Sequence, residues 1–485
     1  MNSPLAVVAL VGRMVVLFAL LMGVPLAFAL VGGDAAAWAF KIAIVVTLAA
    51  GLGASAAVRR FRRELQPRDG FVLVVLTWIV LPVFGALPLL LGIPGLSVTD
   101  AYFESMSAFT ATGATVITGL DDLPLSINVW RCFLQLVGGL GIMVLAVAIL
   151  PLLGVGGSQL FKAEMTGPMK DAKLTPRIAE TARGLWVIYF WFCLACFLGY
   201  RIAGMSWADA FMHMCTTMSL AGFSSHDASF GHWNSAAIEG VAVVFMLLAG
   251  VSFAMYFAAW RKRSLRGLWA SVEVRAYLGC IAGAVALISA YIHAHGQYAS
   301  YAEAFRHTVF HVVSVATTTG YASQDYAQWP IFAPLLMILL GCFATCAGST
   351  GGGIKMIRVI VLLKQSQREL VRAVHPQAVT PVIVGDQMID QRVMQNVIAF
   401  MMLYGGAIVV FTMAMLFSGL DVVTAFSAVI ACLNNIGPGL GEVGPAVNFG
   451  GLSDFQTWLC TAAMLLGRLE LLTVLVLFTP QFWRR

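Results

Sequence analysis

The sequence predicts an all-α polytopic membrane protein in which four outer loops re-enter the bilayer. Three observations lead to this fold class. Of the 485 residues, 60% are hydrophobic and 11% are charged, whereas soluble domains carry about 25% charged residues. Ten apolar segments are long enough to cross a bilayer, and one polar, glycine-ended motif recurs four times between them.

A spanning helix needs about 20 mostly apolar residues. Segments of this kind lie at 8–31, 38–57, 70–92, 127–154, 184–203, 235–260, 275–294, 330–363, 393–418 and 455–480. The tripeptide Ala27-Phe28-Ala29 in the first segment could pass for a signal-peptidase site. We expect this helix to be retained in the mature protein, because the topology predicted from the basic residues is most consistent with it.

Basic residues cluster on one side of the predicted spans. They are Arg59, Arg60, Arg62, Arg63, Arg68, Lys162, Lys170, Lys173, Arg177, Arg183, Arg261, Lys262, Arg263, Arg266, Lys355, Arg358, Lys364, Arg368, Arg372, Arg484 and Arg485. The positive-inside rule makes this side cytoplasmic and places both termini there. The net charge of +6 is then a topology signal, and no nucleic-acid partner is expected.

The outer side carries few cations: Lys41, Arg131, Arg201 and Arg306. More than half of the carboxylates fall there, among them Glu104, Asp121 and Asp209. We therefore expect an outer surface that attracts cations.

Four outer loops contain the recurring motif. Aligned on a glycine, the copies read DAYFESMSAFTATGA, DAFMHMCTTMSLAGF, TVFHVVSVATTTGY and TAFSAVIACLNNIGP. Each copy is too short to cross the bilayer and suits a re-entrant helix. Non-helical backbone at that depth is stable only where it is buried in protein or lines water.

Four such loops around one axis predict a cation selectivity filter. Glycine permits backbone conformations closed to other residues, and consecutive carbonyls can then replace the hydration shell of an ion. The candidate ligands are the backbone carbonyls of Thr110, Ala111, Thr112, Gly113, Ser219, Leu220, Ala221, Gly222, Thr317, Thr318, Thr319, Gly320, Asn434, Asn435, Ile436 and Gly437. Four unrelated interfacial loops are the alternative.

These motifs resemble those of the TrkH family. The cytoplasmic TGPMKDAKLTPR and the run AGSTGGGIK from Ala347 to Lys355 add to the resemblance. The members of this family are the potassium-translocating membrane subunits of bacterial Trk uptake systems, within the Trk/Ktr/HKT superfamily. The resemblance covers essentially the whole chain. It implies an N-terminal helical hairpin at 1–66 and four linked helix–pore-loop–helix units in pseudo-four-fold arrangement, at 67–155, 180–265, 272–365 and 390–485.

The resemblance also implies a function and partners. It implies potassium uptake across the bacterial inner membrane by a lipid-embedded homodimer with one pore per subunit. A cytoplasmic TrkA-like regulatory subunit would carry the nucleotide-binding domains. The metal expected on this chain is potassium at the filter carbonyls only, and no organic cofactor is expected.

The four loops depart from a uniform filter. Thr110-Ala111-Thr112 and Thr317-Thr318-Thr319 are similar to potassium channels, whereas Ser219-Leu220-Ala221 and Asn434-Asn435-Ile436 are not. None has the full TVGYG run of those channels. We expect fewer ion sites and weaker discrimination of potassium over sodium.

The eighth apolar segment is interrupted by AGSTGGG at 347–353. Each of its four glycines disfavours a helix by about 1 kcal/mol relative to alanine. A polar, unwound segment in mid-membrane must line water or protein. In the TrkH family this segment obstructs the pore beneath the filter, which makes Gly348, Ser349, Thr350, Gly351, Gly352 and Gly353 candidate gate residues. A cytoplasmic loop after a short span is the alternative.

Arg468 lies inside the tenth apolar segment. An arginine near the centre of a spanning helix costs about 2.5–3.5 kcal/mol on insertion scales. Glu470 is two residues on and cannot share its helix face. We expect Glu470 to have another partner and Arg468 to face the pore, where it would hold the gate segment. An ion pair between helices is the alternative.

Two other functions share some of these sequence features. A membrane metalloenzyme is disfavoured, because His307 and His311 lack the glutamate of an HExxH motif and a third ligand. We expect both histidines to belong to the third pore helix. We do not expect the protein to be an enzyme. A cation-coupled secondary transporter, moving potassium with a proton or sodium, is closer, because broken helices also mark that class. The repeats here are parallel and not inverted, but coupling stays open.

Overall fold

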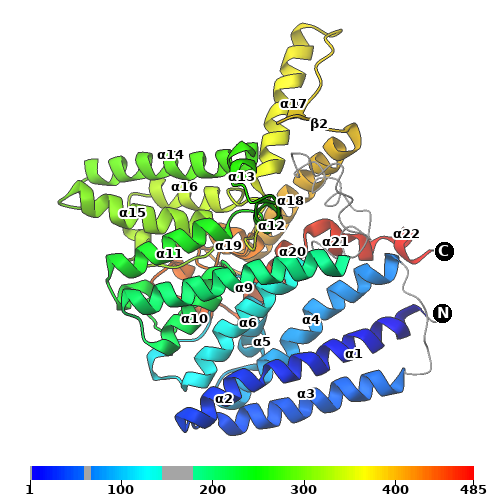
Figure 1. The fold of residues 1–485 in the computed structure, drawn as a ribbon, viewed down its shortest axis with the longest axis vertical. Coiled ribbons are helices and arrows are strands. Elements are labelled where there is room, and N and C mark those ends of the chain that lie inside the picture. The colour runs from blue at the N-terminus through cyan, green and yellow to red at the C-terminus, as the bar shows by residue number, and fades with distance from the viewer. Residues whose placement is uncertain (1–2, 59–66, 145–177, 485) are drawn as a thin grey trace.

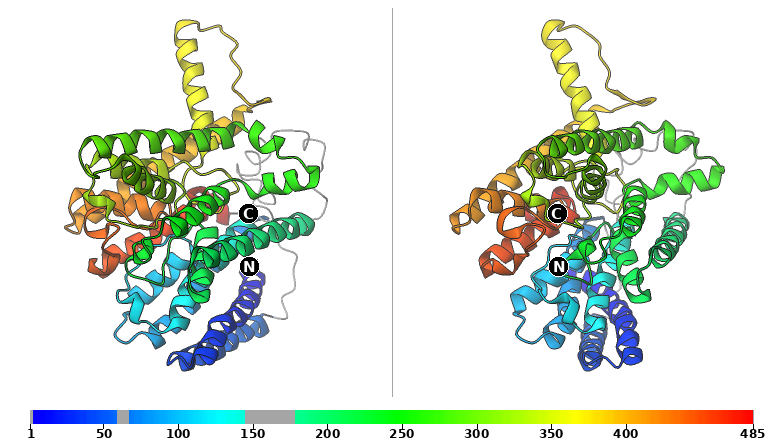
Figure 2. Two further views of the ribbon diagram at one scale, coloured as in Figure 1. Left: turned by 60° about the vertical axis from the view of Figure 1, so that its left-hand side comes forward. Right: turned by 90° about the vertical axis from the view of Figure 1, so that its left-hand side faces the viewer.

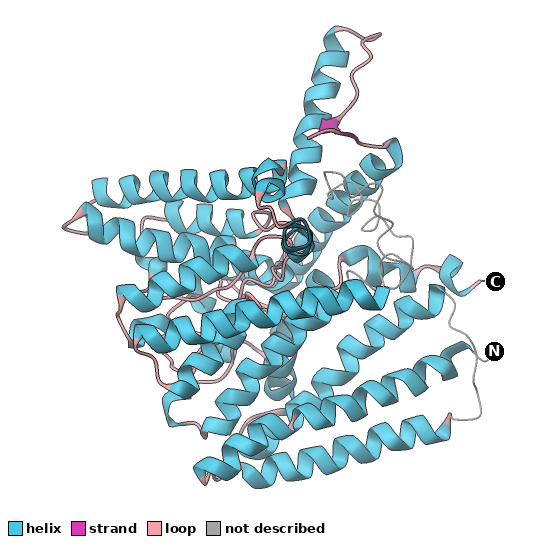
Figure 3. Ribbon diagram, viewed as in Figure 1, coloured by secondary structure: helices cyan, strands magenta, loops and turns pink. Residues whose placement is uncertain are grey.

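The computed structural model describes residues 3–58, 67–144 and 178–484 and consists almost wholly of helices (Figures 1 and 3). Within this part, its one sheet is a hairpin of β1 (Ile383–Val384) and β2 (Gln387–Met388). The two ends of the described chain lie on the same side of the molecule (Figure 1). Several predicted features lie outside the described residues: the motif TGPMKDAKLTPR, the predicted ends at 66 and 155, and Arg59, Arg60, Arg62, Arg63, Lys162, Lys170, Lys173, Arg177 and Arg485.

An N-terminal hairpin lies beside the rest of the bundle (blue in Figure 2). In it α1 (Ser3–Leu21) and α2 (Gly23–Gly32) form one candidate span, and α3 (Ala37–Ala57) returns along them. The helices approach closely at Gly12 and Gly51, where a Cβ on Gly51 would lie 2.8 Å from the Gly12 carbonyl oxygen. Small residues at such contacts are typical of helix packing in membranes.

Four units follow, each with a short helix that ends in one of the four motifs. The short helices are α5 (Val98–Phe109), α10 (Trp207–Met218), α15 (Tyr301–Ala316) and α19 (Val422–Leu433), and each ends just before its motif glycine. They begin alike, because a side-chain oxygen of Ser97, Ser206, Ser300 or Asp421 accepts a hydrogen bond from the backbone N–H three residues on. Such caps pair N–H groups that a helix start leaves free.

The remaining helices complete the units. They are α4 (Pro67–Gly92) and α6 (Leu125–Val144), then α9 (Ile178–Ala203), α11 (Ala236–Ala249), α12 (Phe253–Lys262) and α13 (Arg266–Ala270), then α14 (Val272–Ala294), α16 (Phe332–Gly341) and α17 (Met356–Val374), and lastly α18 (Gln391–Phe417), α20 (Asp454–Arg468), α21 (Leu471–Leu475) and α22 (Pro480–Trp483).

Two predicted spans are broken, which corrects the sequence-based prediction. Six described helices are straight candidate spans, and two more are bent pairs. In place of a continuous helix at 235–260, α11 and α12 meet at 83°; in place of one at 455–480, α20 and 471–478 meet at 107°. The eighth predicted span is α16, an unwound stretch and α17, which starts at Met356. The fourth is described only to Val144.

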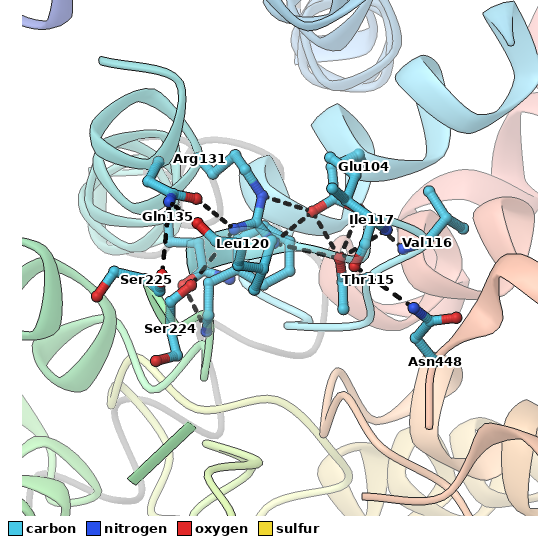
Figure 4. A network of polar contacts seen from close by, with 12 residues as sticks. Glu104, Thr115, Val116, Ile117, Leu120, Arg131, Gln135, Ser224, Ser225 and Asn448 are labelled. Carbon is cyan, nitrogen blue, oxygen red and sulfur yellow. Dashed lines mark hydrogen bonds and ion pairs between the residues drawn. The ribbon is translucent and has the colours of Figure 1, made fainter. Parts of the chain in front are cut away.

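A buried ion pair ties the first unit to the second (Figure 4). Arg131 Nη2 on α6 lies 2.7 Å from Glu104 Oε1 on α5, and both side chains are almost fully buried. Glu104 also accepts hydrogen bonds from Thr115 Oγ1 and Val116 N at 3.0 Å, and Arg131 Nη1 donates to the Ser224 carbonyl oxygen at 3.3 Å. Glu104 is thus wrongly predicted to belong to a cation-attracting outer surface, because its charge is buried and paired.

Glu104→Gln should destabilise the fold. The amide nitrogen cannot accept from Thr115 or Val116, and Arg131 would lose its counter-charge. Removing one partner of a buried ion pair costs about 3–5 kcal/mol. We expect a lower melting temperature in detergent, followed by tryptophan fluorescence. Glu303→Gln, on the exposed first turn of α15, is the control, and equal melting temperatures for both variants would contradict the prediction.

Candidate functional site

The four motif glycines share one backbone conformation. Their φ angles are positive: 85° at Gly113, 77° at Gly222, 86° at Gly320 and 100° at Gly437. The residue two places earlier also has a positive φ, between 53° and 63°, at Ala111, Leu220, Thr318 and Asn435. Residues with a side chain adopt this region rarely. The four loops therefore follow the same unusual path although their side chains differ.

The four loops contact one another in a closed cycle. Each glycine abuts the carbonyl oxygen that precedes the glycine of the next unit, and a Cβ in its place would lie closer than 3.0 Å to that oxygen. The pairs are Gly113 with Ala221, Gly222 with Thr319, Gly320 with Ile436 and Gly437 with Thr112. No side chain fits at these contacts, so the ring closes only with glycine.

Nearly all carbonyl oxygens of the loops have no hydrogen-bond donor among the described residues. The N–H before each glycine donates into the preceding short helix, as Thr319 N does to the Ser314 carbonyl oxygen at 2.8 Å. Among the sixteen predicted filter carbonyls, only that of Ala221 accepts a hydrogen bond from the described residues, from Gln135 Nε2 at 2.9 Å. Buried carbonyls are nearly always paired, so this ring can bind water or a dehydrated cation.

The first side chain of each loop makes the same bond. Thr110, Ser219, Thr317 and Asn434 donate to the carbonyl oxygen four residues earlier, at 2.7–2.9 Å. Asn435 Nδ2 also donates to Thr112 Oγ1 at 2.9 Å, from the fourth unit to the first. Serine and asparagine thus replace threonine without altering the backbone.

The predicted gate segment is unwound and touches the start of the filter loops. Thr350 Oγ1 donates to the Met218 carbonyl oxygen at 3.0 Å, and Gly352 N donates to Thr318 Oγ1 at 2.9 Å. A Cβ on Gly352 would lie closer than 3.0 Å to the Asn434 carbonyl oxygen. The segment therefore contacts the second, third and fourth units beside the carbonyl ring.

The gate segment also pairs the backbone at the bend of the second unit. Cys346 N donates to the Gly250 carbonyl oxygen at 3.0 Å, and Phe253 N donates to the Gly348 carbonyl oxygen at 3.1 Å. The break between α11 and α12 thus frees backbone groups that form hydrogen bonds with the gate segment and the residue before it.

Arg468, the last residue of α20, reaches the same segment. Its Nη1 donates to the Thr350 carbonyl oxygen at 2.9 Å, and its Nη2 lies 3.5 Å from the Gly138 carbonyl oxygen. The side chain is 4% exposed, and its contacts within the described residues include no carboxylate. Glu470 instead pairs with Arg358 Nη2 at 2.8 Å. The geometry therefore disfavours the alternative of an interhelical ion pair at Arg468.

Two charged residues outside the predicted site hold the ends of the gate segment. Glu273 Oε1, at the start of α14, accepts from Ala347 N at 2.8 Å and from Ile357 N at 3.3 Å. Lys355 Nζ, grouped by sequence with the cytoplasmic cations, donates to the Gly351 carbonyl oxygen. A carboxylate at the start of an apolar helix was the only sequence signal for Glu273, because its partners lie 74 and 84 positions away.

An open cavity of ≈ 90 Å³ lies on the predicted outer side of the ring. We call it the outer vestibule; Gly113, Gly222, Gly320, Arg131 and His226 are among its lining residues. Near it, the ring of His226 donates to the carboxylate of Asp121, which lowers the pKa of Asp121 and keeps it charged at neutral pH.

His307 and His311 both lie on α15, the third short helix. His311 Nε2 accepts from Ser323 N at 3.2 Å, just after the third filter loop, and His307 stacks on Tyr298. They belong to no described cluster of three metal-binding side chains.

The comparisons with known proteins agree over nearly the full chain. A family model described as TrkH, cation transport protein, matches residues 37–485. The Trk system potassium uptake proteins TrkH of Halomonas elongata and of Escherichia coli are each 44% identical over 480 residues, or 99% of both chains. TrkG of Escherichia coli is 40% identical over 474 residues, covering 98% of this chain and 97% of that one.

The similarity extends to a solved structure. The crystal structure of the potassium transporter TrkH from Vibrio parahaemolyticus matches with a TM-score of 0.91 and 43% identity, over 99% of both chains. The chain belongs to the TrkH family of cation transport proteins.

Proposed function

We propose that this chain carries potassium across the bacterial inner membrane through a selectivity filter made of the carbonyl oxygens of its four loops. The relatives named above are potassium uptake proteins. The observation that carries the proposal is the closed ring of loops whose carbonyls have, with one exception, no donor among the described residues. Such oxygens can replace the hydration shell of potassium.

Gly348, Ser349, Thr350, Gly351, Gly352 and Gly353 form the gate in this proposal. Arg468 binds the segment, and its fixed charge beside the filter raises the barrier to a passing cation. Glycines permit several backbone states. The segment can therefore leave the path without repacking of the surrounding helices.

Regulation and assembly are proposed to act through α17. This helix begins just after the gate segment and projects from the bundle (Figure 1). A cytoplasmic TrkA-like subunit, which would hold the regulatory nucleotide, can pull on it. Its exposed Leu363, Leu370 and Val374 suit a contact within a homodimer. Both termini then lie in the cytoplasm.

Reconstitution tests the proposal. Purified protein in potassium-loaded liposomes should accumulate a rubidium tracer, and empty liposomes should not. Absence of uptake both with and without the regulatory subunit would refute potassium conduction. Uptake driven uphill by a proton or sodium gradient would establish the coupled transporter instead.

Gly320→Ser should lower potassium selectivity while the protein still inserts. A non-glycine residue at positive φ costs about 1–2 kcal/mol, and the new Cβ meets the Ile436 carbonyl oxygen. Gly283→Ser on α14 of the same unit is the control, because its Cβ would meet nothing within 4 Å. The readout is the ratio of potassium to sodium flux into liposomes, and an unchanged ratio would remove Gly320 from the filter.

Deleting 348–353 should raise ion flux and weaken its dependence on the regulatory subunit. Arg468→Ala should act in the same direction, because a hydrogen bond to a charged group contributes about 1.5–3 kcal/mol, which corresponds to a shift of about 10- to 150-fold toward the open state. Filter selectivity should not change. Flux is measured with and without the subunit. The control variant is Arg275→Ala, on the exposed face of α14. If ion flux through both variants stays low and fully dependent on the subunit, the segment is not the gate.

A further inference from the structure

A cluster of three metal-binding side chains lies where the outer loops of the first two units meet. Asp121 belongs to the short helix η1 (Leu120–Asp122), and His226 and His232 belong to the loop around η4 (Ser229–His232). Their ligand atoms all lie within 4.8 Å of one another. His226 Nδ1 contacts Asp121 Oδ1, and His232 Nδ1 lies 4.0 Å from the same oxygen.

The ligand types select a class of metal. Two imidazoles and one carboxylate suit zinc and similar divalent transition metals, with water in the fourth position. Magnesium and calcium prefer sites made of oxygen. The side chains of Asp121 and His232 are 46% and 43% exposed, so an ion can reach them from outside.

The surroundings of His226 resemble the support of a metal ligand. Its second nitrogen, Nε2, lies 3.4 Å from Asp209 Oδ1. Asp209 is held in turn by Ser225 Oγ at 2.8 Å and Ser206 Oγ at 2.7 Å. A carboxylate on the far nitrogen of a histidine fixes its tautomer and raises its basicity toward a metal. With Nε2 facing Asp209, Nδ1 faces the cluster, and it would release the hydrogen that it shares with Asp121 when a metal binds.

The histidine rings also constrain how binding proceeds. The rings of His226 and His232 are stacked, with centroids 3.5 Å apart and planes 8° from parallel. Two parallel rings cannot both aim a lone pair at one ion, so one ring must turn. His232 is the more exposed of the two, so we take it to be the ring that turns, while His226 keeps its Nε2 toward Asp209.

We propose that Asp121, His226 and His232 form an external site for zinc or a similar divalent transition metal. His226 lines the outer vestibule, so a bound dication places positive charge beside the entrance and joins the loops of two units. Binding should therefore slow potassium entry. That consequence rests on the proposed function, whereas the binding itself does not.

Zinc binding to the purified full-length protein, free of any affinity tag, tests the site. Calorimetry at fixed pH should show one zinc ion per chain, and millimolar magnesium or calcium should not compete. Asp121→Asn and His232→Gln change exposed side chains and should each weaken binding at least tenfold. Asp122→Asn and His295→Gln, both exposed elsewhere on the outer side, should bind like the parent protein.

Flux into liposomes separates the two parts of the proposal. External zinc should slow rubidium uptake by the parent and the two controls but not by Asp121→Asn or His232→Gln. No zinc binding by the parent, or unchanged binding in both ligand variants, would overturn the site. Binding without any change of flux would overturn only its effect on entry. If the parent protein takes up no rubidium, the proposed function is refuted. Calorimetry would then still show whether zinc binds at the site.

Discussion

Backbone polar groups inside a membrane have no bulk water to bind, so each must find a partner in the protein or in a water-filled path. The four filter loops meet this requirement unequally. Their N–H groups bond back to the short helices, while nearly all their carbonyls remain unpaired by described residues. The positive φ angles at Gly113 and its three equivalents produce this division. A peptide path that would be unstable in lipid is thereby suited to cations.

The same requirement shapes the backbone around the gate segment. Unwinding between α16 and α17 frees N–H and carbonyl groups, and neighbouring elements pair them. The broken second unit supplies backbone at Gly250 and Phe253, and Arg468 at the end of α20 supplies a guanidinium. Glu273 closes both ends of the segment. In both bent spans, groups at the break therefore bind the unwound backbone next to them.

Several buried charges are neutralised by an opposite charge in contact with them. Glu104 and Arg131 neutralise each other behind the first two loops, and Arg358 is paired with Glu470 and lies over the Phe400 ring. Arg468 differs, because carbonyl oxygens are its partners. Among the described residues no carboxylate contacts its guanidinium, which is what the proposed role as a barrier to cations requires.

The sequence alone determined the helical membrane class, most of the spans, the positions of the four glycines and the unwound stretch at 347–353, because composition, length and glycine content act locally. It also predicted that Glu470 pairs elsewhere than with Arg468, although α20 ends at Arg468 and the helix-face argument behind the prediction does not apply there. Only the tertiary structure decided that α11 and α20 bend, that Glu104 is paired, and that Glu273 holds the gate segment. The cluster of Asp121, His226 and His232 likewise exists only in the fold. The partners of Glu104 lie 11 to 27 positions away, and those of the other features lie 74 to 118 positions away. A pattern read along one chain carries no record of which distant groups meet.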